Sequence, residues 1–304
     1  MKLFDLHCDS PLRLYRRGAS LYENDLHVSL KKASVFERYL QCAAVWSDER
    51  LSDSDCLALF INACRYFRSE AEGLMIGSRE DLEKATDTGF ILTVEDARLL
   101  CKDLENLSLL FKCGVRVLTL LWSGESSVGC AWDTEGSLSR FGKEVLEGCF
   151  DIGIIPDLSH ANDTVTSYAI ERSIKRGKPV IATHSNSRAV CPHMRNMTDE
   201  NAQKIAENGG IIGVSLFPPH LKGETAGISD VLCHIGHYIN VCGSESICLG
   251  CDLDGIDTTP EEISHVGDLE RLYDPIEKAF GSKTADGITF NNAYKFFLNN
   301  LPQG

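Results

Sequence analysis

The chain has 304 residues, of which 43% are apolar and 24% are charged, and this composition is typical of a globular protein with a substantial core. Its formal net charge of -14 argues against a nucleic-acid-binding surface and against attraction to an anionic membrane, because both require clustered basic residues. The length fits one large α/β barrel or two ordinary domains, and an enzyme acting on small molecules fits the charge better than a scaffold for polyanions.

Eight short apolar segments rich in β-forming residues are predicted to be strands. In chain order they cover residues 2–9, 41–47, 90–95, 115–122, 154–160, 179–185, 210–217 and 247–254. Helical spacing and polar capping residues mark most of the intervals, at residues 53–68, 97–113, 141–148, 164–175, 199–207 and 228–241, and a closing helix is expected at 289–301. Because parallel strands need crossover connections, strands that alternate with helices predict a parallel sheet.

We predict that this sheet closes into a (β/α)8 barrel of the TIM type, with residues 1–304 forming a single domain. Eight strands over this length suit such a barrel, whose usual size is about 250 residues. No low-complexity stretch or linker divides the chain. An open, doubly wound sheet is the structural alternative, but no Gly-x-Gly-x-x-Gly motif follows the first strand.

Five of the predicted strands end on residues that commonly bind metal ions. His7 and Asp9 are two residues apart and therefore point to the same face of the first strand. In a barrel the carboxyl ends of distant strands ring one mouth, whereas in an open sheet they would lie apart. The candidate ligands are His7, Asp9, Glu95, His160, His184 and Asp252.

Three imidazoles and three carboxylates suit zinc or a similar divalent ion. Six ligands are too many for one tetrahedral ion, so we predict two ions that share a bridging carboxylate, a pair that can activate water for hydrolysis. Structural roles remain open for single residues. Asp9 could cap the helix that follows the first strand, and Glu95 could cap the helix that starts near Ala97. Asp252 could pair with a surface cation.

Other patterns carry weaker signals. The thirteen cysteines are odd in number and irregularly spaced, which favours reduced core thiols, and Cys248 and Cys251 are expected along a buried strand. His234 and His237 lack the glutamate and the spacing of a metalloprotease helix and are interpreted as solvated histidines. Neither a phosphate-binding loop nor a Gly-x-Ser-x-Gly motif is present, so nucleotide and serine-nucleophile mechanisms are not expected.

Five motifs together resemble the renal (membrane) dipeptidase family of binuclear zinc peptidases, which have an amidohydrolase-like barrel. They occur in the family's order and extend over almost the whole chain. The motifs are Asp-Leu-His-Cys-Asp at residues 5–9, Thr-Val-Glu-Asp at 93–96, Asp-Leu-Ser-His at 157–160, Thr-His-Ser-Asn-Ser-Arg at 183–188 followed by His-Met-Arg-Asn at 193–196, and Gly-Cys-Asp-Leu-Asp-Gly at 250–255.

The resemblance implies a role for each candidate ligand. His7 and Asp9 would hold one zinc ion, His160 and His184 would hold the other, and Glu95 would bridge the two. A metal-bridging hydroxide would then attack the scissile carbonyl of a dipeptide.

The resemblance also implies how the substrate is held. Asp252 would bind at the first zinc, relay a proton to the departing amine and receive the substrate's amino group, which makes Asp252 and Glu95 the catalytic candidates. Arg195 matches the family arginine that grips the terminal carboxylate, a task that suits a guanidinium group.

Trp122 marks a departure from the family pattern. Family members usually carry a histidine after the fourth strand, where it contacts the substrate carbonyl. An indole can donate one hydrogen bond but cannot act as a base. We therefore expect Trp122 to be a substrate-binding residue that alters the substrate range.

The sequence thus predicts a zinc-dependent dipeptidase acting on L,L and also on L,D dipeptides. Two alternatives remain open: a binuclear metal hydrolase of another amide or of a lactone, and an inactive metal-binding relative. The first residues do not resemble a signal peptide, so a cytoplasmic enzyme is expected. A homodimer is a possible assembly, and neither nucleic acid nor a membrane is an expected partner.

Overall fold

Seven regular strands form one parallel sheet in the computed structural model, which describes residues 1–304. Neighbouring strands follow the order β5-β4-β3-β2-β1-β7-β6, and every pairing is parallel. The strands are β1 (Lys2–Cys8), β2 (Arg38–Trp46), β3 (Thr88–Glu95), β4 (Val115–Thr119), β5 (Ile155–Asp157), β6 (Ile212–Val214) and β7 (Ile247–Leu249).

Residues 179–185, predicted as a strand, close the sheet into a barrel without forming a regular strand. Ile181 makes an isolated parallel bridge to β5, and Ala182 makes one to β6. The backbone N–H of Thr183 instead donates to the side chain of Asp157 over 2.8 Å. The barrel prediction is confirmed, and this segment is irregular because a carboxylate takes the place of a backbone partner.

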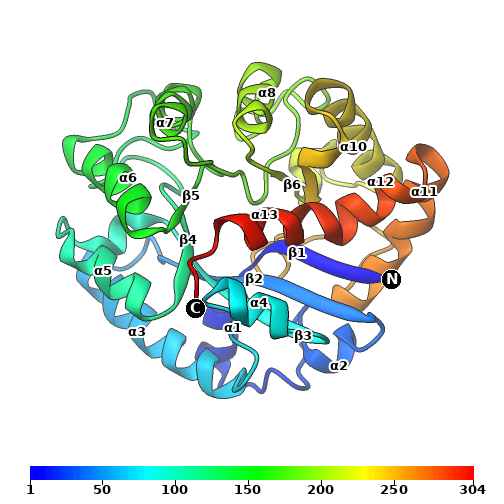
Figure 1. The fold of residues 1–304 in the computed structure, drawn as a ribbon, viewed down its shortest axis with the longest axis horizontal. Coiled ribbons are helices and arrows are strands. Elements are labelled where there is room, and N and C mark those ends of the chain that lie inside the picture. The colour runs from blue at the N-terminus through cyan, green and yellow to red at the C-terminus, as the bar shows by residue number, and fades with distance from the viewer.

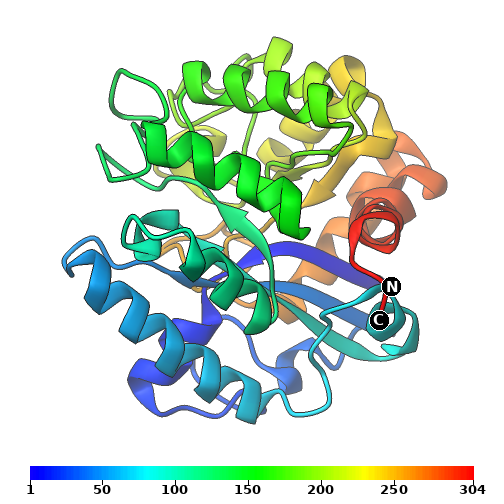
Figure 2. The same ribbon diagram turned by 60° about the vertical axis from the view of Figure 1, so that its left-hand side comes forward.

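Helices surround the strands in Figure 1, and the turned view in Figure 2 shows this outer layer from a second side. Ser52, Ser139 and Asn162 start three of them by accepting a hydrogen bond from a backbone N–H of the first turn. None of the helices combines the length and the apolar character that crossing a membrane requires. The α-helices are α1 (Ser10–Arg17), α2 (Leu30–Ala33), α3 (Asp53–Glu70), α4 (Arg79–Lys84), α5 (Glu105–Lys112), α6 (Arg140–Ile152), α7 (Asp163–Arg176), α8 (Asp199–Glu207), α9 (Pro218–Leu221), α10 (Ile228–Cys242), α11 (Tyr273–Phe280), α12 (Ser282–Asp286) and α13 (Asn292–Asn300).

The helix predicted at residues 97–113 is wrong in its middle. A 3-10 turn at Ala97–Leu100 and the separate helix α5 replace it, because Cys101 and Lys102 adopt left-handed backbone conformations with φ of 55° and 58°. Further 3-10 turns span Ser244–Ser246 and Val266–Leu272, and Gly287–Asn291 forms a π-helical turn before α13. The other predicted helices agree with α3, α6, α7, α8, α10 and α13, whereas α1, α2, α4, α9, α11 and α12 have no predicted counterpart.

The interior of the barrel holds its own apolar cluster, which α13 closes at the amino-terminal end of the strands. Phe297 of α13 stacks on Phe4 of β1 with ring centroids 5.2 Å apart, and α13 lies against β1 (Figure 1, red). A second, larger cluster fills the layer between strands and helices. Residues of the inner cluster include Phe4, Leu6, Leu40, Cys42, Ile91, Val117, Ile155, Ile181, Ile211, Cys248, Phe290, Ala293, Phe296, Phe297 and Leu301.

β1 departs from strict alternation near its end. Phe4 and Leu6 belong to the inner cluster, whereas Cys8, which strict alternation would also point inward, belongs to the outer one. The pairing of β1 with β2 shifts register between Asp5 and Cys8. This irregularity re-aims the last residues of the strand, so that His7 faces the open mouth of the barrel.

All thirteen cysteines are free thiols. Cys248 and Cys251 are buried at β7 and just after it, as expected. Cys248 lies in the inner cluster and Cys251 in the outer one, so the two thiols face opposite sides of the barrel wall.

Candidate metal centre

All six predicted ligands meet at the carboxyl-terminal mouth of the barrel. His7 and His184 lie deepest, with side chains only 1% exposed. A cavity of about 640 Å³ opens onto the other four, which are Asp9, Glu95, His160 and Asp252. The strand ends named by the sequence therefore converge on one place, as a closed barrel requires.

Glu95 lies between two groups of possible ligands. It forms one group with His7 and Asp9 and another with His160 and His184, and within each group the ligand atoms lie within 4.8 Å of one another. Its Oε1 is 3.0 Å from Nε2 of His160, 3.3 Å from Nε2 of His184 and 3.7 Å from Nε2 of His7. A carboxylate shared by two groups is the arrangement that a bridged pair of ions needs.

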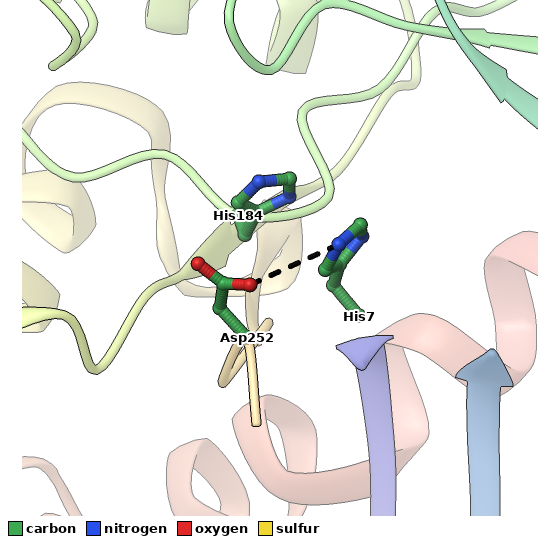
Figure 3. Close-up of side chains that lie close together, drawn as sticks. All are labelled: His7, His184 and Asp252. Carbon is green, nitrogen blue, oxygen red and sulfur yellow. Dashed lines mark ion pairs between the residues drawn. The ribbon is translucent and has the colours of Figure 1, made fainter. Parts of the chain in front are cut away.

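Asp252 extends the first group. Figure 3 shows the side chains of His7, His184 and Asp252 pointing toward one another, with Nε2 of His7 3.9 Å from Oδ1 of Asp252. The same Nε2 is 3.4 Å from Oδ2 of Asp9. The Asp9 side chain makes no capping hydrogen bond to α1, although Asp9 occupies the N-cap position, so the carboxylate faces His7 instead.

Hydrogen bonds at the far ring nitrogens determine how His160 and His184 face each other. Nδ1 of His160 lies 3.0 Å from the backbone oxygen of Trp122, which can only accept, so Nδ1 carries the proton. Nδ1 of His184 lies 2.8 Å from Oγ1 of Thr183. That hydroxyl donates its own proton to Asp157 over 2.6 Å and therefore accepts from His184. Both Nε2 atoms then present lone pairs, although they are only 2.9 Å apart.

Two facing lone pairs repel each other unless a cation lies between them, and Oε1 of Glu95 faces the same space. Nε2 of His7 and Oδ1 of Asp9 are also buried and have no hydrogen-bond partner. Buried polar atoms are rarely left unpaired. This set of nitrogen and oxygen donors fits divalent ions such as zinc.

Asp157 supports the centre, and the sequence prediction does not include it. Its carboxylate accepts hydrogen bonds from the hydroxyls of Thr119 and Thr183, each over 2.6 Å, and from the backbone N–H of Ser159 over 3.0 Å. Through Thr183 it fixes the tautomer of His184. Its position three residues before His160, within the Asp-Leu-Ser-His motif, is the signal that points to it.

The crowded charges alter protonation before any ion binds. Burial lowers the pKa of the His7 imidazole, but the negative charges of Glu95, Asp9 and Asp252 outweigh burial and raise that pKa to about 10. Burial, with the charge of Asp9, raises the pKa of Glu95 well above its usual value, and burial raises the pKa of Asp252 to about 7. Burial lowers the pKa of the other two imidazoles, so they stay neutral and available as ligands.

The backbone at two candidate ligands is strained. His160 and Asp252 adopt left-handed conformations with φ of 67° and 62°, which cost a non-glycine residue roughly 1–3 kcal/mol. Gly255 leaves room beside Asp252, because a Cβ at Gly255 would come within 2.3 Å of carboxylate oxygens of both Asp252 and Asp9. The absent side chain at Gly255 therefore lets the carboxylates of Asp252 and Asp9 occupy this space.

Arg195 is buried beside the ligands. Its Nη1 donates to Oγ of Ser185 over 3.1 Å, and its Nη2 donates to the backbone oxygen of His184 over 3.0 Å. Its Nε is buried and has no partner. A buried guanidinium with an unpaired donor next to a candidate ligand suits an anionic group.

Helix α10 holds the loop that carries Arg195. Nδ1 of His234 accepts from the backbone N–H of Ser187 over 3.0 Å, and its Nε2 donates to the backbone oxygen of Leu221 over 2.9 Å. The interpretation of His234 as a solvated histidine is therefore wrong, because these two backbone contacts bury it, whereas His237 remains partly exposed.

Trp122 lines the cavity, but its backbone supports the metal centre. Its carbonyl oxygen accepts the Nδ1 proton of His160, as described above. Its indole lies 4.8 Å from the ring of Trp46, which also lines the cavity. The two indoles form an apolar wall above the ligands.

The chain is similar to known peptidases along almost its whole length. The family model described as membrane dipeptidase (peptidase family M19) matches residues 1–299. Dipeptidase 3 of Rattus norvegicus is 27% identical over 299 residues, which cover 95% of this chain and 60% of that protein. Dipeptidase 3 of Homo sapiens is 30% identical over 243 residues, which cover 77% of this chain and 49% of that protein. The chain thus spans about half to three fifths of the length of these relatives.

Two solved structures share the fold. One is a dipeptidase of family M19, with a TM-score of 0.91 and 23% identity over 100% of this chain and 99% of that one. The other is a metallopeptidase from Rhodobacter sphaeroides bound to a phosphinate mimic of L-Ala-D-Ala, with a TM-score of 0.90 and 22% identity over 99% of each chain. Since the family model covers nearly the whole sequence, the chain belongs to the membrane dipeptidase family, peptidase family M19.

Proposed function

We propose that this protein is a metallo-dipeptidase that binds two divalent ions, with zinc as the expected metal, and hydrolyses the peptide bond of dipeptides. The observation that carries the proposal is the position of Glu95 between two ligand groups in a chain of the dipeptidase family. The ligand of the Rhodobacter sphaeroides protein, a mimic of L-Ala-D-Ala, supports the inclusion of L,D dipeptides among the substrates.

Each of the two ligand groups would bind one ion. His7, Asp9 and Glu95 would hold one ion, and Glu95, His160 and His184 would hold the other. When bound, the two ions would lower the pKa of a water molecule toward neutrality and polarise the scissile carbonyl.

Asp252 and Arg195 would handle the substrate. Asp252 lies at the cavity beside His7, and its carboxylate would take up a proton and pass it to the departing amine. The buried guanidinium of Arg195 would bind the terminal carboxylate of the substrate. With Asp252 also near the amino group, the site would recognise both ends of a dipeptide and reject longer peptides.

The test combines a metal count with a substrate screen. We expect zinc-loaded protein to hold two ions per chain and to hydrolyse members of a library of L,L and L,D dipeptides, but not their N-acetylated forms. Glu95→Gln should lose both the second ion and the hydrolysis, because the bridging charge is gone. A folded, fully loaded protein that cleaves no dipeptide would overturn the proposal.

A second candidate is a binuclear hydrolase of a cyclic amide, a lactone or an N-acyl amino acid. The indole of Trp122 at the cavity favours it, because the resemblance leads us to expect a histidine at that place. Assaying these substrates beside dipeptides discriminates the two activities. Location in the cytoplasm and assembly as a homodimer stay predictions of the sequence.

A further inference from the structure

Four arginines line one side of the cavity. Arg13, Arg16 and Arg17 come from α1, and Arg50 comes from the loop after β2. Residues three and four apart share one face of a helix, so α1, which starts directly after Asp9, presents its three arginines together. This arginine wall is unusual in a chain with a net charge of -14.

The carboxylates that contact the arginine wall neutralise it only in part. Arg16 and Arg50 both contact the single buried carboxylate of Asp48, each over 2.5 Å. Arg13 is 3.7 Å from Asp257, whose side chain is 94% exposed, so water screens that pair. Arg17 is 3.0 Å from Asp25, whose side chain is 81% exposed, so water screens this pair as well. The four arginines thus contact three carboxylates, and the wall keeps one positive charge in excess of its partners.

The acidic residues that also line the cavity are largely engaged. Three of them are candidate metal ligands, whose charge two divalent ions would offset. Asp254 accepts hydrogen bonds from Oγ of Ser10 over 2.5 Å and from the backbone N–H of His27 over 2.7 Å. The remaining two, Glu49 and Asp257, are exposed to solvent. An anion, rather than a cation, is the group that this side of the cavity favours.

The arginine wall and Arg195 lie on opposite sides of the barrel mouth. Around the closed sheet, the order from β1 runs through β2, β3, β4 and β5 to the segment of Ile181 and then to β6 and β7. β1, which leads to α1 and its three arginines, is therefore three steps from the segment that leads to Arg195, and β2, which leads to Arg50, is four steps from it. A dipeptide whose terminal carboxylate binds Arg195 would extend its first residue across the ligands toward the wall.

We propose that the arginine wall of Arg13, Arg16, Arg17 and Arg50 binds the acidic side chain of the substrate's amino-terminal residue, so that the preferred dipeptides begin with glutamate or aspartate. This assignment rests on the proposed dipeptidase function, because it uses the direction in which a dipeptide lies in the site.

The test compares L-Glu-L-Ala with L-Gln-L-Ala, which has nearly the same shape but no charge. We expect kcat/KM to be about fivefold higher for L-Glu-L-Ala, chiefly through a lower KM, as partly exposed ion pairs would give. High salt should shrink this ratio, because salt screens exposed charges. L-Ala-L-Glu should show no such advantage over L-Ala-L-Gln.

Arg13→Gln should bring the ratio of L-Glu-L-Ala to L-Gln-L-Ala toward one. The matched control is Arg140→Gln, which removes a 94% exposed arginine on α6, outside the cavity, and should leave the wild-type ratio. Equal turnover of L-Glu-L-Ala and L-Gln-L-Ala by the wild type would overturn the assignment while the dipeptidase function stands. So would a preference that only L-Ala-L-Glu shows, or a ratio that Arg13→Gln leaves unchanged.

Binding provides a readout that does not require turnover. Calorimetric titration of the zinc-loaded protein with phosphinate analogues of Glu-Ala and Gln-Ala should give about fivefold tighter binding of the acidic analogue, and Arg13→Gln should remove the difference. Equal affinities would overturn the assignment. If no dipeptide is cleaved, the proposed function fails, and this titration still decides whether the wall selects an acidic side chain.

Discussion

At the scale of single residues, Asp252 combines a place beside His7 with access to the cavity. Five other candidate ligands remain if its charge is removed. We therefore expect Asp252→Asn to lower kcat by about 10² to 10⁴-fold, the usual contribution of a proton-transferring group, while the protein still binds zinc. Steady-state kinetics beside a metal count measures both effects.

Asp274→Asn is the control for this substitution, because it removes an exposed carboxylate on α11 away from the cavity. Its kcat should equal that of the wild type. Unchanged turnover in Asp252→Asn would remove this carboxylate from proton transfer and leave it, at most, a role in metal binding.

Thr183 connects Asp157 to the imidazole of His184. Thr183→Val keeps the shape of the side chain but removes the acceptor for Nδ1–H of His184, so the ring loses its fixed tautomer. We expect zinc affinity to fall by about 10 to 100-fold, as for other partners that orient a ligand. Competition with a chelator measures this loss.

Thr164→Val, an exposed change on α7, should leave zinc affinity as it is. Unchanged affinity in Thr183→Val would mean that the hydrogen bond to Thr183 does not orient His184.

At the scale of elements, the sequence located the strands and the longer helices, because their apolar periodicity is local. It also named candidate ligands that meet at one mouth, because they end strands whose direction the barrel determines. Irregular elements depend on contacts between distant segments. The register shift in β1, which re-aims His7, depends on pairing with β2, and the irregular segment at residues 179–185 depends on Asp157. No local pattern around Thr183 or His7 carries that information.

Helix α13 closes the inner cluster, and its Phe297 stacks on Phe4 of β1. Because Phe297 is fully buried, Phe297→Ala should lower the free energy of unfolding by about 3–5 kcal/mol through lost burial and a cavity. Urea unfolding of the zinc-loaded protein measures the change. Lys295→Ala, on the exposed face of the same helix, should change it by no more than about 0.5 kcal/mol. Equal effects of the two substitutions would contradict the conclusion that α13 closes the inner apolar cluster.

At the scale of the whole molecule, the barrel is closed by apolar packing at one end and carries a cluster of ionisable groups at the other. Metal binding therefore couples to protonation and to stability. If His7 binds zinc as proposed, its imidazole must be neutral, yet the carboxylates around it raise the pKa of that imidazole to about 10 in the metal-free protein. Binding must expel this proton, so zinc affinity should rise with pH up to that value.

The direction of each pKa shift determines how stability and zinc affinity change with pH. A raised histidine pKa stabilises the metal-free fold below the usual pKa near 6.5, and this stabilisation is lost as pH rises through about 10. The affinity for zinc should increase over the same pH range. Below about pH 7 the carboxyl of Asp252, whose pKa is raised to about 7, also holds a proton that zinc must displace. The rise in Tm caused by saturating zinc should thus be larger at about pH 8 than at about pH 6.

Two measurements check this coupling. Calorimetric titration with zinc in buffers of different ionisation enthalpy should reveal about one proton released at pH 8 and more at pH 6. Thermal unfolding with and without chelator should give the larger zinc effect at the higher pH. Zinc-induced shifts in Tm that are equal at the two pH values, together with no proton release, would mean that His7 is neutral before zinc binds. The carboxylates would then not keep the His7 imidazole protonated in the metal-free protein, and metal binding would not be coupled to the loss of its proton.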